Sequence, residues 1–585
     1  MAGILIPFLI FTPWLTAILV WFIGDKHEEG LHQFASAGAI LSAILSLLLL
    51  SQIGDSTISF AKIGPLFGNL SFSTDALGII LACIANCIGS LTVIFSAEYM
   101  KHEKSLARYY SMVLLFIGAM SGLVLTANIF MIFFFWEITA LCSYQLISFY
   151  NDDPNAVRGG LKALFITQFG GIGLMVAGLL IFGYTHSFEI GRFIQAAQGG
   201  EIPANVLGII GFTLIIAATA KSAQFPFFTW LPDAMEAPTP VSALIHAATM
   251  VNAGVYLLCR FFPALEAVPG WKMTILILGL ITILISSLMA IFATDLKRVL
   301  AYSTVSQLGY MFAAIGAGSV LACQFHLLSH AIFKALLFLC AGAIIHSCGT
   351  RDMYKMGGFF KKIPFISVTF IIGSLALAGI PVLNGFWSKE LILESIHSGT
   401  PIIIYILMLF SVILTALYTI RCVWLVFFGE PRSDLHVHDA PFLMALPLGI
   451  LSLGTITSWL VFEPFSRSLS NSLPLYGIPK ETLSELVSKI FGDPYTFLAL
   501  GMVAIGILIW FLRNKLPLHN SITRKIKSIS LNSFGFEAIN NGVVNGINAA
   551  SEAIRNIQTG SLNWNIFGML IGLICILIAL MIGGL

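Results

Sequence analysis

Charged residues are scarce in this chain. Lys and Arg number 30 and Asp and Glu number 28 among 585 residues, or 10% of the sequence, whereas soluble domains average about 25%. Hydrophobic residues make up 58% of the chain, and its mean hydropathy is +0.93. So few charges cannot cover the surface of a soluble protein of this length. This excludes a soluble enzyme, a nucleic-acid-binding protein and a disordered chain.

Several motifs are also missing. The nine cysteines form no C-x-x-C pair, so their spacing indicates no iron–sulfur cluster, zinc site or disulfide framework. No G-x-x-x-x-G-K-[ST] stretch occurs, and no long polar domain could hold a flavin or a nicotinamide. We therefore expect no cofactor and no metal in this chain. The amino terminus has no basic segment, which predicts that the first apolar segment stays as a membrane span.

Long apolar segments are what the chain does contain. They predict an all-α polytopic membrane protein of about 16 transmembrane helices, each of roughly 20 residues. We count 18 Lys and Arg, up to Lys527, in the connections after odd-numbered spans, against six after even-numbered spans. The positive-inside rule then places both termini outside the cell membrane. The spans are expected near residues 3–23, 33–53, 76–99, 109–126, 128–149, 161–183, 205–225, 239–262, 272–293, 297–317, 319–346, 364–396, 401–428, 441–462, 494–513 and 562–583.

The seventh and twelfth spans are interrupted by proline and polar residues, at 220–233 and at 379–390. Proline removes a helix hydrogen bond, and such backbone is tolerated at membrane depth only where it lines a cavity or is buried in protein. The two interruptions lie five spans apart, and an odd offset reverses orientation. Spans 4–8 and 9–13 are therefore predicted to form two inverted five-helix repeats with broken helices. Two proline kinks without a role are the alternative.

The whole chain is predicted to have six parts. Apolar residues recur every three or four positions between Phe536 and Ile557, which indicates an amphipathic helix too polar to span, lying along the cytoplasmic interface or on a partner. The parts are N-terminal transmembrane helices at 1–108, the two repeats at 109–264 and 265–430, C-terminal transmembrane helices at 431–515, the amphipathic lateral helix at 516–561 and a last transmembrane helix at 562–585.

A few ionisable residues fall inside the apolar segments. A charge at the bilayer centre costs about 2.5–3.5 kcal/mol on insertion scales, so such residues are typical of ion paths. Burial brings lysine and glutamate toward their neutral forms, in which they can exchange protons with histidine and water. The predicted proton path comprises Glu137, Lys221, His246, His326, His330, Lys334 and Lys389. His326, His330 and Lys334 belong to the eleventh span and are spaced by four, so they share one helix face. Supporting residues are Asp295, Lys297, Ser303, Thr304, Gln307 and Glu390.

Each assignment has an alternative. Glu137 and Lys221 could form a static buried ion pair, and His246 could simply bond a carbonyl. Asp295 and Lys297 could be interfacial anchors, and Glu390 could face the membrane surface. The H-x-x-x-H spacing of the eleventh span could suggest zinc, but the metalloprotease helix requires H-E-x-x-H, and Leu327 stands where the glutamate is needed.

Several stretches resemble the antiporter-like subunits of respiratory complex I. These are F-F-W-E-I-T-A-L-C-S-Y at 134–144, the segment from Ala220 to Val251, T-D-L-K-R-V-L-A-Y-S-T-V-S-Q-L-G-Y-M at 294–311, H-L-L-S-H-A-I-F-K-A-L-L-F-L at 326–339 and G-F-W-S-K-E at 385–390. The later spans look most like the NADH-quinone oxidoreductase subunit L type. Related chains occur in Mrp-type sodium/proton antiporters, membrane-bound hydrogenases and coenzyme F420 dehydrogenases.

The resemblance implies a proton-translocating subunit of a complex I-related membrane oxidoreductase. It implies a buried pair of Glu137 and Lys221, a path continuing through the histidines, and partners that are other antiporter-like subunits and redox subunits of iron–sulfur, quinone or hydrogenase type. In two features the chain departs from subunit L. Gly170 and Gly171 stand near where an aspartate is common, and the lateral helix looks shorter, which suggests a smaller complex.

Two other functions remain open from the sequence. One is a subunit of an Mrp-type sodium/proton antiporter without a redox partner. The other is an intramembrane metallohydrolase that would use His326 and His330.

Overall fold

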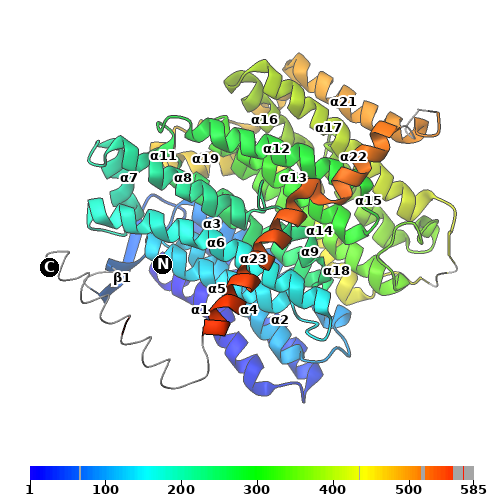
Figure 1. Cartoon of the computed structure of the whole chain (residues 1–585), viewed down its shortest axis with the longest axis horizontal. Coiled ribbons are helices and arrows are strands. Elements are labelled where there is room, and N and C mark those ends of the chain that lie inside the picture. The colour runs from blue at the N-terminus through cyan, green and yellow to red at the C-terminus, as the bar shows by residue number, and fades with distance from the viewer. Residues whose placement is uncertain (65–67, 434, 436, 516–520, 558–570, 572–585) are drawn as a thin grey trace. The chain divides into compact units, whose positions relative to one another are not determined.

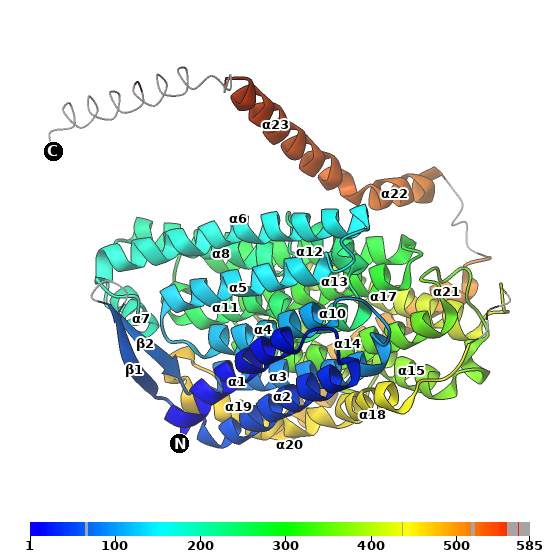
Figure 2. The ribbon, with the colours of Figure 1, turned by 90° about the horizontal axis from the view of Figure 1, so that it is seen from below.

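The computed structural model describes residues 1–64, 68–433, 435, 437–515, 521–557 and 571. The chain divides into two compact units, Met1–Arg524 and Lys525–Leu585. The first unit is built almost entirely of helices that run side by side, which confirms the predicted helical membrane fold (Figures 1 and 2). Up to the first break its helices are α1 (Ala2–Ile23), α2 (Glu28–Leu49), α3 (Ala76–Tyr99), α4 (Leu106–Leu125), α5 (Ile129–Ile147), α6 (Pro154–Thr185), α7 (Ile190–Gln198) and α8 (Ala204–Lys221), with a 3-10 turn η1 (Leu50–Gln52).

The second part of this unit contains both longer helices and short pieces. In chain order these are α9 (Trp230–Asp233), η2 (Ala234–Glu236), α10 (Thr239–Ala243), η3 (Leu244–Ala248), α11 (Met250–Leu265), α12 (Trp271–Phe292), α13 (Leu296–Gly316), α14 (Val320–Cys348), η4 (Phe359–Lys361), α15 (Pro364–Ala378), α16 (Asn384–Gly399), α17 (Ile402–Val423), η5 (Trp424–Phe428), α18 (Phe442–Thr457), η6 (Ser458–Val461), α19 (Phe462–Ser472), η7 (Pro474–Tyr476), α20 (Leu483–Gly492) and α21 (Pro494–Leu512).

Thirteen of the described helical segments are long and apolar enough to cross a membrane. A helix or a pair of helices lies at each of the first fifteen predicted spans. Two of those fifteen fall outside the thirteen, because α13 carries polar side chains along its length and the twelfth span is divided into α15 and α16. The sixteenth predicted span, 562–583, lies outside the described residues apart from Ile571. The number of spans and the inverted repeats stay predictions.

Both predicted interruptions are real breaks in the helices. Helix α8 ends at Lys221, and Ala223 then adopts a positive φ of 49°. Helix α15 ends at Ala378, Gly379 has a φ of 85°, and α16 begins at Asn384. Glycine suits the second position because it has no Cβ to clash in the left-handed region.

A third break divides the eighth predicted span, where the sequence indicates a continuous helix. A π-helical turn, η3, separates α10 from α11, and Thr249 has φ −130° and ψ −108°. The hydroxyl of Thr249 donates to the Leu244 carbonyl at 2.7 Å, and the amide of Asn252 donates to the Ala247 carbonyl at 2.7 Å. These side chains satisfy carbonyls that the break leaves free, which is how irregular backbone survives inside a buried helix.

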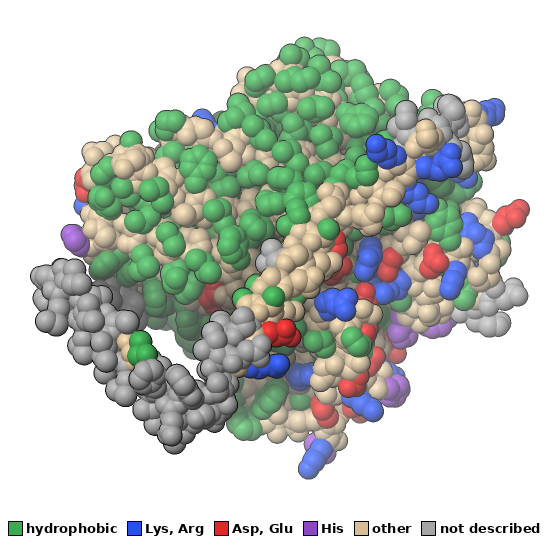
Figure 3. All heavy atoms as spheres, in the orientation of Figure 1, with side chains coloured by type: hydrophobic (Ala, Val, Ile, Leu, Met, Phe, Trp, Pro, Cys, Tyr) green, Lys and Arg blue, Asp and Glu red, His purple; other side chains and the backbone are tan. Residues whose placement is uncertain are grey.

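Helix α14 lies at the centre of the second half of the bundle. It packs against α3, α10, α13, α15, α16 and α18, and most of its side chains are buried. Outside this core, hydrophobic side chains cover much of the face in Figure 3, over α8, α12 and α17, whereas charged side chains gather in other places. An apolar outer surface of this kind is expected of helices that contact lipid or partner subunits.

A β-hairpin follows α2 that the all-α prediction does not include. Strands β1 (Thr57–Gly64) and β2 (Gly68–Ser73) pair antiparallel, with Thr57 opposite Ser73. Alternation of polar and apolar residues through Thr57, Ile58, Ser59 and Phe60, with glycines at the turn, is the sequence signal that indicates it.

In the C-terminal region the structure has α22 (Ser521–Leu531), a short turn η8 (Ser533–Gly535) and α23 (Phe536–Ile557). Phe534 adopts φ 53°, which separates the two helices. Helix α23 covers the range whose periodicity predicts an amphipathic helix, and it exposes Ile539, Val544 and Ile547.

Candidate functional site

Lys221 lies at the C-terminal end of α8 and is completely buried. A helix C-terminus favours a cation because the carbonyl dipoles point there. Its Nζ donates to the backbone carbonyl of Trp136 at 2.9 Å and lies 4.7 Å from the centre of that indole ring. The break after α8 therefore aims this lysine at helix α5.

Glu137 is the next residue of α5, close enough to Lys221 for electrostatic interaction. Among the described residues, however, no ion pair within 4.0 Å joins the two, and Oε1 of Glu137 has no hydrogen-bond partner. A Cβ at Gly171 would overlap that oxygen. Gly171 thus makes room for the Glu137 carboxylate.

His246 occupies the π-helical turn η3 and is fully buried. Its ring stacks on Phe338 of α14 with centroids 5.1 Å apart. Within the described part of the chain, neither ring nitrogen has a hydrogen-bond partner. The alternative in which His246 bonds a carbonyl has no support from this geometry.

Lys334 follows on α14, also fully buried. Its Nζ donates to Oγ of Ser303 on α13 at 2.5 Å, and Ser303 in turn donates to the Leu300 carbonyl at 2.8 Å. Thr304 donates to the same carbonyl at 3.0 Å. Ser303 therefore contacts Lys334 directly, whereas the Thr304 hydroxyl bonds its own helix.

His330 and His326 lie one and two turns before Lys334 on the same helix face. The two imidazole centroids are 6.4 Å apart. His326 is hydrogen-bonded on both sides, by Nδ1 to Oγ of Ser388 at 2.9 Å and by Nε2 to Oε1 of Gln307 at 3.2 Å. His330 has no hydrogen-bond partner on either nitrogen among the described residues. Where the structure describes the chain, no group of three or more His, Cys, Asp or Glu side chains lies close enough to hold a metal ion.

Lys389 lies next to Ser388, in the second turn of α16. Its Nζ donates to the Leu377 carbonyl at 2.9 Å and lies 5.5 Å from the centre of the Tyr310 ring. Glu390, the next residue, is 8% exposed and lines a cavity at the end of the bundle. Ser388 is a residue that the sequence analysis does not assign, although its place between Trp387 and Lys389 at membrane depth could have indicated it.

Asp295 and Lys297 lie at the N-terminal end of α13. Asp295 caps the helix by accepting from the backbone N–H of Lys297 at 2.8 Å, and it pairs with Arg351 at 3.2 Å. Arg351 also pairs with Glu236 at 2.9 Å. Burial lowers the pKa of Arg351, but these two carboxylates outweigh it and raise the pKa above its ordinary value.

The Lys297 side chain extends inward from this charged cluster. It is 3% exposed, and its Nζ donates to the Ala237 carbonyl at 2.6 Å. Asp295 therefore has the geometry of an anchor, whereas Lys297, like Lys221, Lys334 and Lys389, is buried.

At the other end of the bundle, Lys489 of α20 lies between two carboxylates. Its Nζ is 3.0 Å from Glu394 and 3.3 Å from Glu481. Burial lowers its pKa, but the hydrogen bond and charge of Glu394 and the charge of Glu481 raise it above the ordinary value. Its sequence context does not distinguish this lysine, because it lies in a connection among other polar residues.

The buried polar side chains therefore lie along the inside of the bundle as separate groups rather than as one continuous chain of hydrogen bonds.

Protein-family models match this region. One described as "NADH:quinone oxidoreductase/Mrp antiporter, TM" matches residues 126–415, and one described as "NADH-Ubiquinone oxidoreductase (complex I), chain 5 N-terminus" matches residues 60–110. The chain is also 33% identical to NAD(P)H-quinone oxidoreductase subunit 5, organellar chromatophore 1, of Paulinella chromatophora, over 95% of this chain and 91% of the relative. The chain belongs to this family of antiporter-like membrane subunits.

Other members of the family carry a different name. The chain is 36% identical to Na(+)/H(+) antiporter subunit A1 of Staphylococcus aureus (strain JH9), over 77% of this chain, and it spans 62% of that relative. Among solved structures, the Mrp complex from Dietzia sp. DQ12-45-1b is similar with a TM-score of 0.83 and 25% identity, over 99% of this chain and 63% of that one.

An archaeal complex shares the fold. The membrane-bound sulfane sulfur reductase superposes with a TM-score of 0.78 and 21% identity, over 98% of this chain and 99% of that one. The resemblance read from the sequence motifs is thus confirmed, and the protein is a multi-pass, antiporter-like membrane subunit of the complex I-related family. Its relatives are subunits of multi-subunit complexes.

Proposed function

We propose that this chain carries protons across the membrane as part of a redox-driven complex of the NADH-quinone oxidoreductase kind. The observation that carries the proposal is the series of fully buried Lys221, His246, His330, Lys334 and Lys389, which ends at Glu390 beside a cavity. Burial of several ionisable groups is costly, and such residues inside membrane spans are typical of ion and proton paths. The identity to a quinone-oxidoreductase subunit extends over 95% of this chain, against 77% for the antiporter subunit.

In the proposed mechanism, the proton moves in short steps. Lys221 gives up its proton when Glu137 moves away, and the proton passes by water to His246, then to Lys334 and the histidines of α14. Lys389 and Glu390 form the last step. The redox chemistry takes place in partner subunits, and the termini lie outside the cell membrane, as the distribution of Lys and Arg predicts.

A tagged chain purified with its bound partners and reconstituted into liposomes tests this. We expect Lys221→Ala and Glu137→Gln to lower coupled proton uptake at least tenfold while the complex still assembles. Lys101→Ala, at a side chain that is 52% exposed, is the matched control and should keep the wild-type rate. Full uptake by either path variant would disprove the role of the buried residues.

The second function is that of an Mrp-type sodium/proton antiporter subunit, favoured by 36% identity to the A1 subunit. The same preparation distinguishes the two. Iron–sulfur and quinone- or hydrogenase-type subunits that copurify, with proton uptake on addition of an electron donor, support the first. A sodium gradient that drives proton movement without any redox subunit supports the second.

A further inference from the structure

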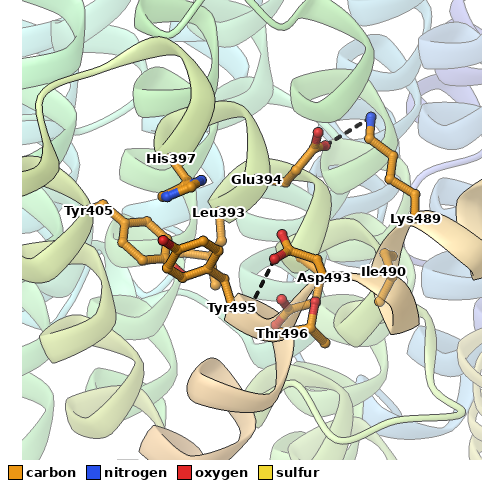
Figure 4. A pocket seen from close by; sticks show the side chains of 10 residues that line it. Leu393, Glu394, His397, Tyr405, Lys489, Ile490, Asp493, Tyr495 and Thr496 are labelled. Carbon is orange, nitrogen blue, oxygen red and sulfur yellow. Dashed lines mark hydrogen bonds and ion pairs between the residues drawn. The ribbon is translucent and has the colours of Figure 1, made fainter.

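A narrow cavity lies where α16 and α17 meet the start of α21 and the short helix α20. Its lining includes Glu390, Glu394, His397, Lys489, Asp493 and Tyr495, all but the first labelled in Figure 4. Its volume of about 10 Å³ is close to the ~10–15 Å³ that a single water needs. We call it the neck. Glu390, which lines the neck, is 8% exposed, and the neighbouring Lys389 is the last buried lysine of the proposed path.

A wider crevice of about 250 Å³ adjoins the neck. It shares Glu394 and Lys489 with the neck, and it is also lined by residues 317–322 and by Tyr476. The crevice is open to solvent, and several waters fit in it. A wet crevice therefore leads to a one-water neck, and the neck leads to a nearly buried carboxylate.

Helices α13 and α14 show at which end of the bundle the neck and the crevice lie. The crevice includes the C-terminal end of α13 and the N-terminal end of α14. Asp295 and Arg351, the charged cluster described above, lie at the opposite ends of these two helices. The neck is thus on the face that the positive-inside rule places outside.

The charges around the neck favour a cation. Carboxylates of Glu390, Glu394 and Asp493 line it, and Lys489 is the one lysine or arginine among the described residues that do so. The imidazole of His397 packs against two phenol rings, with centroids 3.9 Å from Tyr495 and 5.0 Å from Tyr405, and the two phenols are 5.7 Å apart. Histidine exchanges protons near neutral pH and is suited to relay them to water.

Lys489 has two partners, one on each side. Glu394, on α16, lines both the neck and the crevice, whereas Glu481 lines the crevice but not the neck. The lysine can therefore leave Glu394 and remain paired with Glu481, and this movement exchanges one ion pair for another instead of exposing an unpaired charge.

We propose that the neck and the crevice are the outer mouth of the ion path and that Lys489 is its gate. With Lys489 drawn toward Glu481, the Glu390 carboxyl releases its proton to water in the neck, and the Lys389 ammonium then reprotonates the carboxylate. With Lys489 on Glu394, the positive charge at the rim repels a passing cation. This inference rests on the proposed ion transport.

The gate is tested by the rate at which a charged, membrane-impermeant thiosulfonate labels His397→Cys in the reconstituted complex. We expect Lys489→Gln in this background to raise the labelling rate at least threefold, because the neck stays open. Glu481→Gln should lower the rate by a similar factor, because Lys489 is left with Glu394 alone. Tyr495→Cys replaces His397→Cys as the reporter if the latter does not assemble. Equal rates in the three backgrounds overturn the gate.

The mouth is tested in the same preparation by transport. Labelling of Glu394→Cys should lower proton uptake at least tenfold, and a reductant that removes the label should restore it. Ser488→Cys, at an exposed α20 residue that lines neither space, is the matched control and should be labelled without loss. The wild-type chain with the reagent controls for the nine native cysteines.

Two results overturn the mouth: full transport by the labelled Glu394→Cys complex, or labelling of His397→Cys only from the cytoplasmic side of inverted vesicles. Failure of the wild-type complex to move any ion would instead disprove the proposed function. The labelling rates do not depend on transport, so the two failures are distinguishable.

Discussion

The ammonium of Lys389 donates to the carbonyl of Leu377, and Pro381, four residues after Leu377, has no N–H that could compete for that carbonyl. The break between α15 and α16 therefore supplies the acceptor that holds the lysine at membrane depth. Both the ammonium and the neutral amine of Lys389 can donate a hydrogen bond to this carbonyl.

We expect Lys389→Gln to assemble but to transport at least tenfold more slowly than wild type. The glutamine amide can still donate a hydrogen bond, but it cannot give up a proton at neutral pH. Removing a buried charge does not leave another charge unpaired here, because the partner is a carbonyl. Proton uptake by liposomes and size-exclusion of the complex measure the two effects. Wild-type uptake would show that Lys389 only closes the helix break.

Ser303→Ala should lower the rate of proton uptake at least tenfold, because loss of one hydrogen bond to a charged group costs about 1.5–3 kcal/mol in other proteins and about 1.4 kcal/mol corresponds to a factor of ten in rate. Lys334 then loses the only hydrogen-bond acceptor found for its ammonium among the described residues. Ser286→Ala in α12 is the control, because that buried hydroxyl bonds the carbonyl of Thr282 within its own helix. Equal rates for both variants would contradict the role of Ser303.

Gly171→Ala should impair transport without preventing assembly. The added methyl group would occupy the place of Oε1 of Glu137, so the carboxylate must move relative to Lys221. Gly183→Ala lies on the same helix with no atom within 4 Å of the added carbon, and it controls for the change in helix propensity. A normal rate for Gly171→Ala would mean that the Glu137 position is not critical.

Arg260 and Asp75 form a buried, two-pronged ion pair that should stabilise the fold rather than carry protons. The two contacts measure 2.5 and 3.0 Å, and both side chains are nearly inaccessible. Arg260→Met leaves a buried carboxylate unpaired, which costs about 3–5 kcal/mol. We expect a lower thermal-unfolding temperature in detergent.

The double variant Arg260→Met, Asp75→Asn separates this effect from loss of packing. It should recover part of the lost stability, because no charge is left unpaired. A double variant less stable than Arg260→Met would show that the pair is not the cause.

The sequence was informative about the path where a charge interrupts an apolar segment. Lys221, Lys334 and Lys389 are visible in this way, and the structure buries all three. The hydrogen-bond acceptors of Lys221 and Lys389 are the backbone carbonyls of Trp136 and Leu377. The sequence could not predict them, because every residue has a carbonyl and only the fold determines which one a lysine contacts.

Helix breaks and connections differ in how far the sequence predicts them. Prolines at 226 and 381 mark two helix breaks in the sequence, but the third, at Thr249, contains no proline within the turn and depends on side chains that bond freed carbonyls. The β-hairpin and α20 lie in connections, where the search for long apolar segments has nothing to detect. Lys489 was missed for this reason.

Helix α14 places His326, His330 and Lys334 one turn apart, and the first two rings are 6.4 Å from centre to centre. A proton crosses a hydrogen bond of about 2.7–3.2 Å, so no transfer between these rings occurs without an intervening water or a side-chain rotation. For the proposed transport, the rate of proton movement along α14 therefore depends on how often such a bridge forms, and a substitution that restricts rotation of either imidazole should slow it.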